Sequence, residues 1–216
     1  MRTLVLCPTR DNPEGCNRSF LSMLDTSENS DMVACVDDDQ GDLYRGLANH
    51  PRMKVHIGPR TDIVGSVNAA VSAFPDYDVY GLMVDDARFE TPGWDKWLEN
   101  EINSWPNRVG VVSASHNWAR HVNFGYATKE WIEVLGWYAC PSTQHYCWDT
   151  VLEMLGEASR ISYAPKDKFH IHHDLVQKDE TVKIMMMDAV QFLGWCVNER
   201  HDLVVKLREA MCASVS

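Results

Sequence analysis

Residues 79–86 read Val79-Tyr80-Gly81-Leu82-Met83-Val84-Asp85-Asp86, an apolar run that ends on two carboxylates. An apolar run of this length is typical of a buried strand. Side chains at the carboxyl end of such a strand lie where open α/β sheets bind their ligands. Two adjacent carboxylates repel each other there, and a divalent cation or a shared proton relieves that repulsion. An N-cap beside a solvated turn acid is the purely structural alternative for this pair.

Strands and helices are expected to alternate on both sides of this stretch. Apolar runs predict strands at 2–7, 32–36, 52–57, 79–84, 109–113, 161–164 and 169–172. Helical spacing of apolar residues occurs at 16–24, 63–74, 94–105, 128–136, 148–155, 182–197 and 203–211. This alternation predicts an α/β, Rossmann-like fold with a mostly parallel sheet flanked by helices and a helical C-terminal end.

Composition and charge narrow the class of protein. The chain has 216 residues, of which 45% are hydrophobic and 24% charged, as in ordinary soluble globular proteins. Its formal net charge of −11 opposes indiscriminate binding to nucleic acid or to anionic membranes. We find neither an apolar run of the ~20 residues that a membrane span needs nor a secretory signal, so we expect a cytoplasmic protein.

Seven cysteines are scattered through the chain without a CxxC pair. Several lie inside apolar runs, which predicts reduced, buried thiols. Cys140, His145 and Cys147 could be zinc ligands, but no fourth ligand follows at a suitable spacing.

Polar residues follow three of the expected strands. They are the loop at 8–10, the acids at 37–39, and the pair Asp85 and Asp86. Consecutive parallel strands present their carboxyl ends at the same edge of a sheet, so we expect these residues to converge. Neither GxGxxG nor GxxxxGK followed by Ser or Thr occurs in the chain, so the edge has no glycine-rich phosphate cradle. These residues therefore predict a nucleotide held by carboxylates and a metal ion.

Two further groups of residues are candidates for chemistry. In His170-Ile171-His172-His173, strand alternation puts His170 and His172 on one face and His173 on the other. Two imidazoles on one face can share a metal ion with a carboxylate of the acid pair, and solvated surface histidines are the alternative. Asp149 stands at the predicted start of a helix, where it is either a general base or an acid favoured by the helix dipole.

The order of these motifs resembles that of a known enzyme family. An apolar strand precedes the first of the motifs, which are Pro8-Thr9-Arg10, Val36-Asp37-Asp38, Arg60, Asn68, and Val84-Asp85-Asp86 leading to Pro92-Gly93-Trp94. This order looks like the nucleotide-binding half of glycosyltransferases with the GT-A fold, in particular the family 2-like group. The resemblance continues through Trp148-Asp149 and His170-Ile171-His172, and it covers about residues 1–175. It implies a nucleotide-diphospho-sugar transferase that uses a UDP-sugar and either Mn²⁺ or Mg²⁺.

The resemblance also implies roles for individual residues. Those implied for the nucleotide are Pro8, Thr9, Arg10, Asp37, Asp38, Arg60, Asn68 and Asp85. Asp86 matches the metal-binding acid, and His170 or His172 matches the late metal ligand. Asp149 takes the place of the catalytic base of inverting members. The chain departs from the family pattern twice: the Asp-x-Asp motif lacks one carboxylate, and Trp148 stands where Glu commonly precedes the base.

We therefore expect one glycosyltransferase domain over 1–216, with a nucleotide-binding half (1–100), a half that completes the acceptor and metal sites (101–180), and C-terminal helices (181–216). The expected reaction is metal-dependent, inverting transfer of a hexose or pentose from UDP to an acceptor hydroxyl. A hydroxymethylated base in DNA is one candidate acceptor, as in compact phage enzymes, which would place the protein in a host cytoplasm. No membrane partner is expected. A sugar-phosphate nucleotidyltransferase and a non-catalytic nucleotide-sugar-binding module remain open as alternatives.

Overall fold

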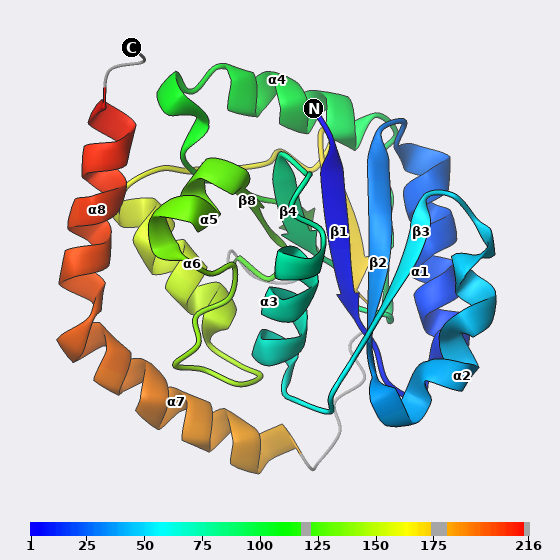
Figure 1. The fold of residues 1–216 in the computed structure, drawn as a ribbon. Helices are drawn as coiled ribbons and strands as arrows, with labels where there is room; N and C mark the ends of the chain where they lie inside the picture. The colour runs from blue at the N-terminus through cyan, green and yellow to red at the C-terminus, as the bar shows by residue number, and fades with distance from the viewer. Residues whose placement is uncertain (118–121, 174–180, 214–216) are drawn as a thin grey trace.

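The structure is a computed structural model, and it describes residues 1–117, 122–173 and 181–213. A seven-stranded sheet runs through the centre of the molecule, with helices on both of its faces (Figure 1). In sheet order its strands are β3 (Met53–Gly58), β2 (Ser30–Asp37), β1 (Thr3–Pro8), β4 (Val79–Leu82), β8 (Gly125–Thr128), β6 (Val111–Ser113) and β9 (Ile161–Tyr163). The first four strands are parallel, and β8 is antiparallel to both of its neighbours. The predicted α/β fold with a mostly parallel sheet is confirmed.

The helices begin and end at residues whose side chains favour those positions. They are α1 (Pro13–Thr26), α2 (Gly41–Tyr44), α3 (Ile63–Ala73), α4 (Trp94–Asn103), α5 (Lys129–Leu135), α6 (Trp148–Ala158), α7 (Thr181–Asn198) and α8 (Arg200–Cys212). Asn12 and Asp62 cap α1 and α3 by accepting a backbone N–H from the first turn. Thr128 caps α5 in the same way, and Gly136 ends it with a left-handed φ of 81°, as the sequence predicts. None of the described helices has the length and apolar character needed to cross a membrane.

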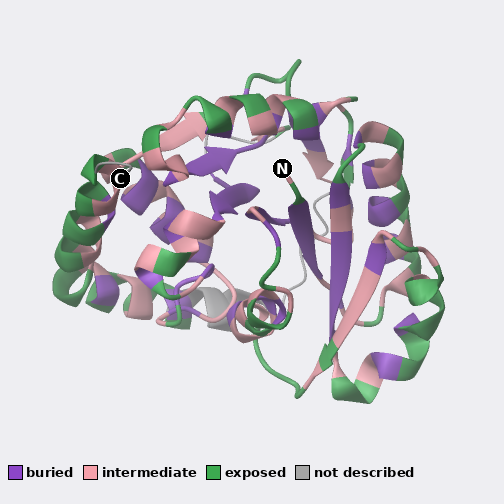
Figure 2. Ribbon diagram, turned by 45° about the horizontal axis from the view of Figure 1, so that its top comes forward, coloured by how far each residue is buried: buried purple, intermediate pink, exposed green. Residues whose placement is uncertain are grey.

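The central strands bury both of their faces (Figure 2). Because successive side chains of a strand point to opposite faces, β1 contributes to two cores. Leu4 and Leu6 pack in the core covered by α3, α5 and α6, whereas Val5 and Cys7 pack in the core covered by α1 and α4. This double burial explains why β1 reads as a continuous apolar run. All seven cysteines lie in the described part of the chain, and each is a free thiol.

A second, three-stranded sheet connects the C-terminal part of the chain to the central strand. It consists of β5 (Ala87–Phe89), β10 (His170–His173) and β7 (Ser115–His116), with β10 in the middle. β10 runs antiparallel to β5, and their register pairs His173 with Ala87 and His172 with Arg88. β5 begins immediately after Asp86, so this pairing brings the histidine motif to the acid pair.

Three short strands, β5, β7 and β8, were not predicted from the sequence, and the strand predicted at 79–84 is shorter than expected. β4 ends at Leu82 rather than at residue 84, because the chain turns there and the Ala87 N–H donates to the Val84 carbonyl at 3.2 Å. β5 and β8 have only three and four residues, which is too short for a clear alternation. β8 lies against β4 because Gly81 leaves room for the buried ring of Tyr126, which would lie 2.0 Å from a Cβ atom at that position.

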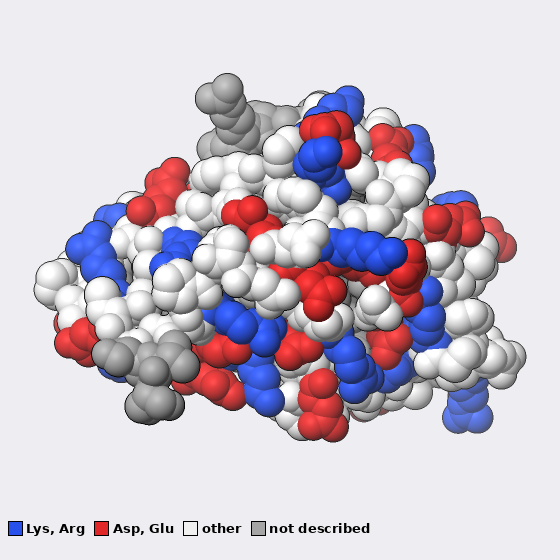
Figure 3. Space-filling view, turned by 90° about the horizontal axis from the view of Figure 1, so that it is seen from above, with Lys and Arg blue, Asp and Glu red and all other residues white. Residues whose placement is uncertain are grey.

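Charged residues at the amino edge of the sheet are largely paired with one another. Figure 3 views the molecule from this side and shows acidic and basic side chains interspersed. The N-terminal amino group lies 2.6 Å from Glu99, and Lys96 lies 2.6 Å from Glu28. The Lys96–Glu28 pair is exposed, and such a pair contributes only ~0–1 kcal/mol to stability. Their opposite charges offset each other at this edge.

Candidate active site

The carboxyl ends of β1, β2, β3 and β4 meet at one edge of the sheet, at the bottom of Figure 1. Side chains from three of these ends form hydrogen bonds with one another. Thr9, after β1, donates to the Asp85 carboxylate after β4 at 2.6 Å. Arg10 donates to Asp37, the last residue of β2, at 2.6 Å. The convergence predicted from strand direction is therefore confirmed.

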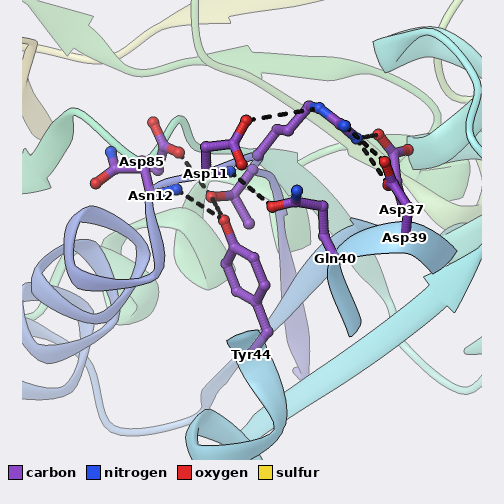
Figure 4. Close-up of polar contacts among 9 residues, drawn as sticks. Asp11, Asn12, Asp37, Asp39, Gln40, Tyr44 and Asp85 are labelled. Carbon is purple, nitrogen blue, oxygen red and sulfur yellow. Dashed lines mark hydrogen bonds and ion pairs between the residues drawn. The ribbon is translucent and has the colours of Figure 1, made fainter. Parts of the chain in front are cut away.

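A chain of hydrogen bonds holds the Asp85 carboxylate in place (Figure 4). The Thr9 hydroxyl donates to Asp85, so its oxygen accepts from the Tyr44 hydroxyl, which lies 3.0 Å away. The Tyr44 oxygen in turn accepts the backbone N–H of Asn12 at 3.0 Å. Burial raises the pKa of Tyr44, which keeps its hydroxyl protonated as a donor. The Asp85 carboxylate is thus oriented by two elements, the β1–α1 loop and α2.

Arg10 binds Asp37 at the end of β2 and Asp39 shortly after it (Figure 4). Its guanidinium donates to Asp39 through two nitrogens, at 2.9 and 2.7 Å, and to Asp37 through one. The hydrogen bonds from Arg10 lower the pKa of Asp39, with a smaller effect in the same direction from Arg60. Arg10 and Asp37, both predicted to meet the nucleotide, therefore form one ion-paired cluster with Asp39, while Asp38 is exposed beside it.

The acid pair meets a histidine of β10. The His173 Nε2 atom lies 3.2 Å from an Asp86 carboxylate oxygen. The other two histidines face Glu90: His170 Nε2 is 3.6 Å and His172 Nδ1 is 3.7 Å from its carboxylate. The alternation of the strand explains this division, because the first and third residues share one face and the fourth has the other. His173 is therefore the histidine nearest to Asp86, whereas the sequence had suggested His170 or His172 as its partner.

His170, the first residue of β10 in the middle of the small sheet, is almost fully buried. Its backbone N–H donates to the Thr91 hydroxyl at 3.0 Å, and its Nδ1 atom lies 3.3 Å from the Ser115 hydroxyl. Burial lowers the pKa of His170, with Lys166 adding to the effect and Glu90 opposing it. A neutral imidazole held by hydrogen bonds is what a metal ligand or a packing residue requires. Its role as a metal ligand stays a prediction.

Asp86 and His173 are suitable ligands for a divalent cation that also binds a nucleotide. They offer one carboxylate oxygen and one imidazole nitrogen, donors that Mn²⁺ accepts. Within residues 1–117, 122–173 and 181–213, no three His, Cys, Asp or Glu side chains are grouped to hold a metal by themselves. Nucleotide enzymes commonly hold the cation with one or two carboxylates and complete its coordination with phosphate oxygens and water. The pair fits a cation of that kind.

Asp149 lies in the first turn of α6, partly buried. Its carboxylate accepts the N–H of Thr150 at 2.7 Å. Burial raises the pKa of Asp149, Glu153 adds to the effect, and the hydrogen bonds from Thr150 oppose it. The loop before α6 reaches the carboxyl edge of the sheet, because the Gln144 carbonyl accepts the N–H of Val64 at the start of α3 at 3.2 Å. A carboxyl with a raised pKa is a stronger base once ionised.

The remaining predicted site residues lie at or near the same edge. Pro8 ends β1, and Arg60 is exposed in the loop after β3, close enough to affect Asp39. Asn68 lies inside α3, where its amide donates to the Ala139 carbonyl at 2.7 Å and accepts the N–H groups of Tyr138 and Ala139. These contacts hold the loop between α5 and α6. The nucleotide-binding role of Asn68 stays a prediction.

Two residues of the site were not identified from the sequence. Tyr44 lies in a four-residue helix without a recognisable motif, and only its position shortly after the acids of β2 hints at a role. His173 was recognised as part of the histidine motif, but His170 or His172 was predicted to be the metal ligand. The antiparallel pairing of β10 with β5, which begins after Asp86, is the signal that identifies it.

Solved structures share this fold, and the similarity covers nearly the whole of this chain. The mannosyltransferase PcManGT from Pyrobaculum calidifontis, in complex with GDP-Man and Mn²⁺, matches with a TM-score of 0.65 and 14% identity, over 98% of this chain and 70% of that one. S. aureus TarS matches with a TM-score of 0.62 and 15% identity, over 97% of this chain and 43% of that one. The fragment TarS 1–349 matches with a TM-score of 0.60 and 14% identity, over 97% and 71% of the two chains.

At this level of identity the likeness establishes the fold, which is the GT-A fold expected from the motifs. This chain spans less than half of the matched TarS chain. No family model matches the sequence, and no curated protein matches it.

Proposed function

We propose that this protein with a GT-A fold is a glycosyltransferase that moves a sugar from a UDP-sugar to an acceptor hydroxyl with the help of Mn²⁺ or Mg²⁺. The observation that carries the proposal is the contact of 3.2 Å between Asp86 and His173 at the carboxyl edge of the sheet. Thr9, Arg10, Asp37 and Asp85 lie along the same edge, where open α/β sheets bind nucleotides. In this proposal these residues contact the base and the ribose of the nucleotide.

The charge of this edge supports a requirement for a cation. Arg10 is already paired with three acids, Asp11, Asp37 and Asp39, and Asp85 and Asp86 add two further carboxylates. A diphosphate approaching these acids would be repelled unless a cation lay between them. Asp86 and His173 would hold this cation, which would neutralise the charge that develops on the departing diphosphate. The neighbour PcManGT, solved with GDP-Man and Mn²⁺, supports this reading.

Asp149 is the proposed base of an inverting reaction. The acceptor hydroxyl would give its proton to the Asp149 carboxylate while its oxygen forms a bond to the anomeric carbon. The bond between that carbon and the diphosphate oxygen breaks, and the electron pair leaves with UDP. The raised pKa of Asp149 favours proton uptake at this step. Attack from the face opposite the leaving diphosphate inverts the configuration of the sugar.

Donor hydrolysis tests this proposal without knowledge of the acceptor. The purified protein is incubated with UDP-sugars and with GDP-mannose, with Mn²⁺, with Mg²⁺ or with EDTA, and released nucleotide is measured. We expect slow release of UDP that requires the cation. Formation of UTP from a UDP-sugar and pyrophosphate would instead indicate a nucleotidyltransferase. Cation-dependent binding without any turnover, also with an acceptor present, would indicate a binding module.

The acceptor can be sought in the same assay. DNA with hydroxymethylated bases is the first candidate, with unmodified DNA as its matched control. The net charge of −11 disfavours unspecific DNA binding, so stimulation of UDP release should require the hydroxymethyl group. Equal rates with both DNAs would remove DNA from the proposal and leave sugar transfer to another hydroxyl in place.

A further inference from the structure

A buried carboxylate in α7 binds the loop that leads to Asp149. Asp188 is fully buried, and its side chain accepts three successive backbone N–H groups. Gln144 donates to one carboxylate oxygen at 3.0 Å, and His145 donates to the other at 2.8 Å. The Tyr146 N–H donates to that second oxygen as well. Backbone N–H groups satisfy an ionised carboxylate strongly, so this contact fixes the loop to α7.

The same loop is also held from its other side. The Gln144 carbonyl accepts the Val64 N–H, so α3 and α7 grip one segment between them. Directly after this segment, Cys147 adopts a left-handed φ of 64°, which is uncommon for a residue other than glycine. Such strain persists where surrounding contacts enforce it, and it is concentrated at functional sites. Asp149 follows two residues later. In Figure 1 the loop between α5 and α6 lies alongside α7.

We propose that Asp188 is a positioning residue, which holds the segment 144–147 so that the Asp149 carboxylate faces the acceptor hydroxyl. The proposal rests on the proposed function, because it assigns to Asp188 a part in the transfer step. Asp188 does not touch the reacting atoms in this account. It acts through three N–H groups and the strained turn at Cys147, which together set where α6 begins.

Replacement of Asp188 by Asn tests the carboxylate itself. The amide keeps one oxygen and turns its NH₂ group toward at least one backbone N–H, so part of the grip is lost. We expect the variant to bind UDP and Mn²⁺ like the parent and to transfer sugar ~10- to 100-fold more slowly, since a shift of ~1 Å in a catalytic group can cost ~10²-fold. Asp202→Asn, an exposed acid in the first turn of α8, is the matched control and should transfer at the parental rate.

A double-mutant cycle separates positioning from a general loss of structure. If Asp188 acts through Asp149, then Asp188→Asn should lower the residual activity of Asp149→Asn by less than ~2-fold, because the group it positions is already gone. A purely structural role would multiply the two losses. Equal fold losses in both backgrounds overturn the proposal, and so does an Asp188→Asn variant that transfers at the parental rate.

Hydrogen exchange on the unmodified protein covers the case in which Asp188→Asn does not fold. The amides of Gln144, His145 and Tyr146 should exchange slowly although they lie in a loop. Fast exchange would contradict the claim that Asp188 holds this loop. The transfer assays also distinguish the positioning role of Asp188 from the proposed transferase function. If the parent transfers sugar and the two substitutions act independently in the double-mutant cycle, the transferase function stands and the positioning role of Asp188 is wrong. A parent that neither hydrolyses nor transfers any donor loses both.

Discussion

At the scale of single residues, the contact between Asp86 and His173 follows from a register of two short strands. β10 pairs with β5 so that His173 lies opposite Ala87, the residue after Asp86. Its ring nitrogen then reaches the carboxylate at 3.2 Å, while His172 turns toward Glu90. Two neighbouring histidines of one strand therefore have different surroundings, and this difference makes a comparison of their variants informative.

Substitution of these two histidines should separate the metal ligand from its neighbour. We expect His173→Ala to weaken binding of UDP in the presence of Mn²⁺ by at least ~10-fold, the lower bound for loss of a partner around a bound metal. Asp86→Ala should do the same, and both variants should keep the fold because neither side chain fills the core. His172→Ala is the matched control. Calorimetric titrations in which His172→Ala loses affinity and His173→Ala does not would reverse the assignment.

The role of Asp149 predicts a change in rate without a change in donor affinity. Asp149→Asn should bind the UDP-sugar like the parent and transfer it ~10²-fold more slowly, since a base acts only in the transition state. Burial raises the pKa of Asp149 above its ordinary ~3.9, so the parental rate should rise with pH through this higher pKa. Asp149→Asn should lack that rise. Single-turnover rates between pH 4 and 8 provide the measurement, and turnover within ~3-fold of the parent would exclude Asp149 as the base.

The stability of the same variant provides a second check. In the folded protein the ionised form of Asp149 is disfavoured relative to the unfolded chain, so its ionisation reduces stability as pH rises above ~3.9. Asp149→Asn removes this cost and keeps an oxygen for the Thr150 N–H. Thermal unfolding at pH 7 should therefore show a midpoint no lower than that of the parent.

The residues at strand ends were predictable, and those set by long-range pairing were not. Asp85 and Asp86 follow an apolar run, and the direction of parallel strands was enough to place them at the ligand edge. The role of Tyr44 depends on how a short helix brings its hydroxyl to the loop after β1, which no local pattern records. The choice among His170, His172 and His173 depends on the pairing of β10 with β5, and a shift by one residue would exchange the faces.

At the scale of secondary structure elements, glycines have opposite effects in a strand and a helix. Gly81→Ala in β4 would place a Cβ atom 2.0 Å from the buried ring of Tyr126, and we expect it to destabilise the protein by ~1–3 kcal/mol. Gly194 lies inside α7 with open space around it, so Gly194→Ala should stabilise the protein by ~0.5–1 kcal/mol. Denaturant unfolding of both variants tests this. Equal stability of Gly81→Ala and the parent would mean that β8 does not pack on β4 as described.

Elements with clear periodicity were predicted correctly, and the short antiparallel strands were missed. β1 and β2 are apolar runs because both of their faces are buried, and α1, α3 and α6 show apolar residues at helical spacing. β8 inserts between β4 and β6 against the direction of the other strands, so the rule of alternating strands and helices does not anticipate it. The packing of Tyr126 over Gly81 determines that insertion, and packing partners are not visible in a local window.

At the scale of the whole molecule, UDP and Mn²⁺ should stabilise the fold together more than either does alone. The described residues supply no complete three-residue metal site, and in the proposed function phosphate oxygens of UDP complete the coordination of the cation. At a concentration of 100 times its Kd, a ligand adds ~2.7 kcal/mol to stability. For a chain of this size that corresponds to a rise in Tm of ~5–10 °C. A thermal shift with UDP alone that equals the shift with UDP and Mn²⁺ would contradict a shared site.

The pairing of β10 with β5 also has a consequence for how the protein is made. Asp86 belongs to the first half of the chain, and His173 is synthesised much later. Contacts between residues so distant in sequence form late, because a long stretch of chain must first be ordered between them. When only the first four parallel strands have left the ribosome, the carboxylates at the sheet edge are already made, but the imidazole of His173 is still missing. If the proposed function holds, the nascent chain gains its ability to bind a metal–nucleotide complex only after β10 has emerged and docked, so that ligand binding reports completion of the fold.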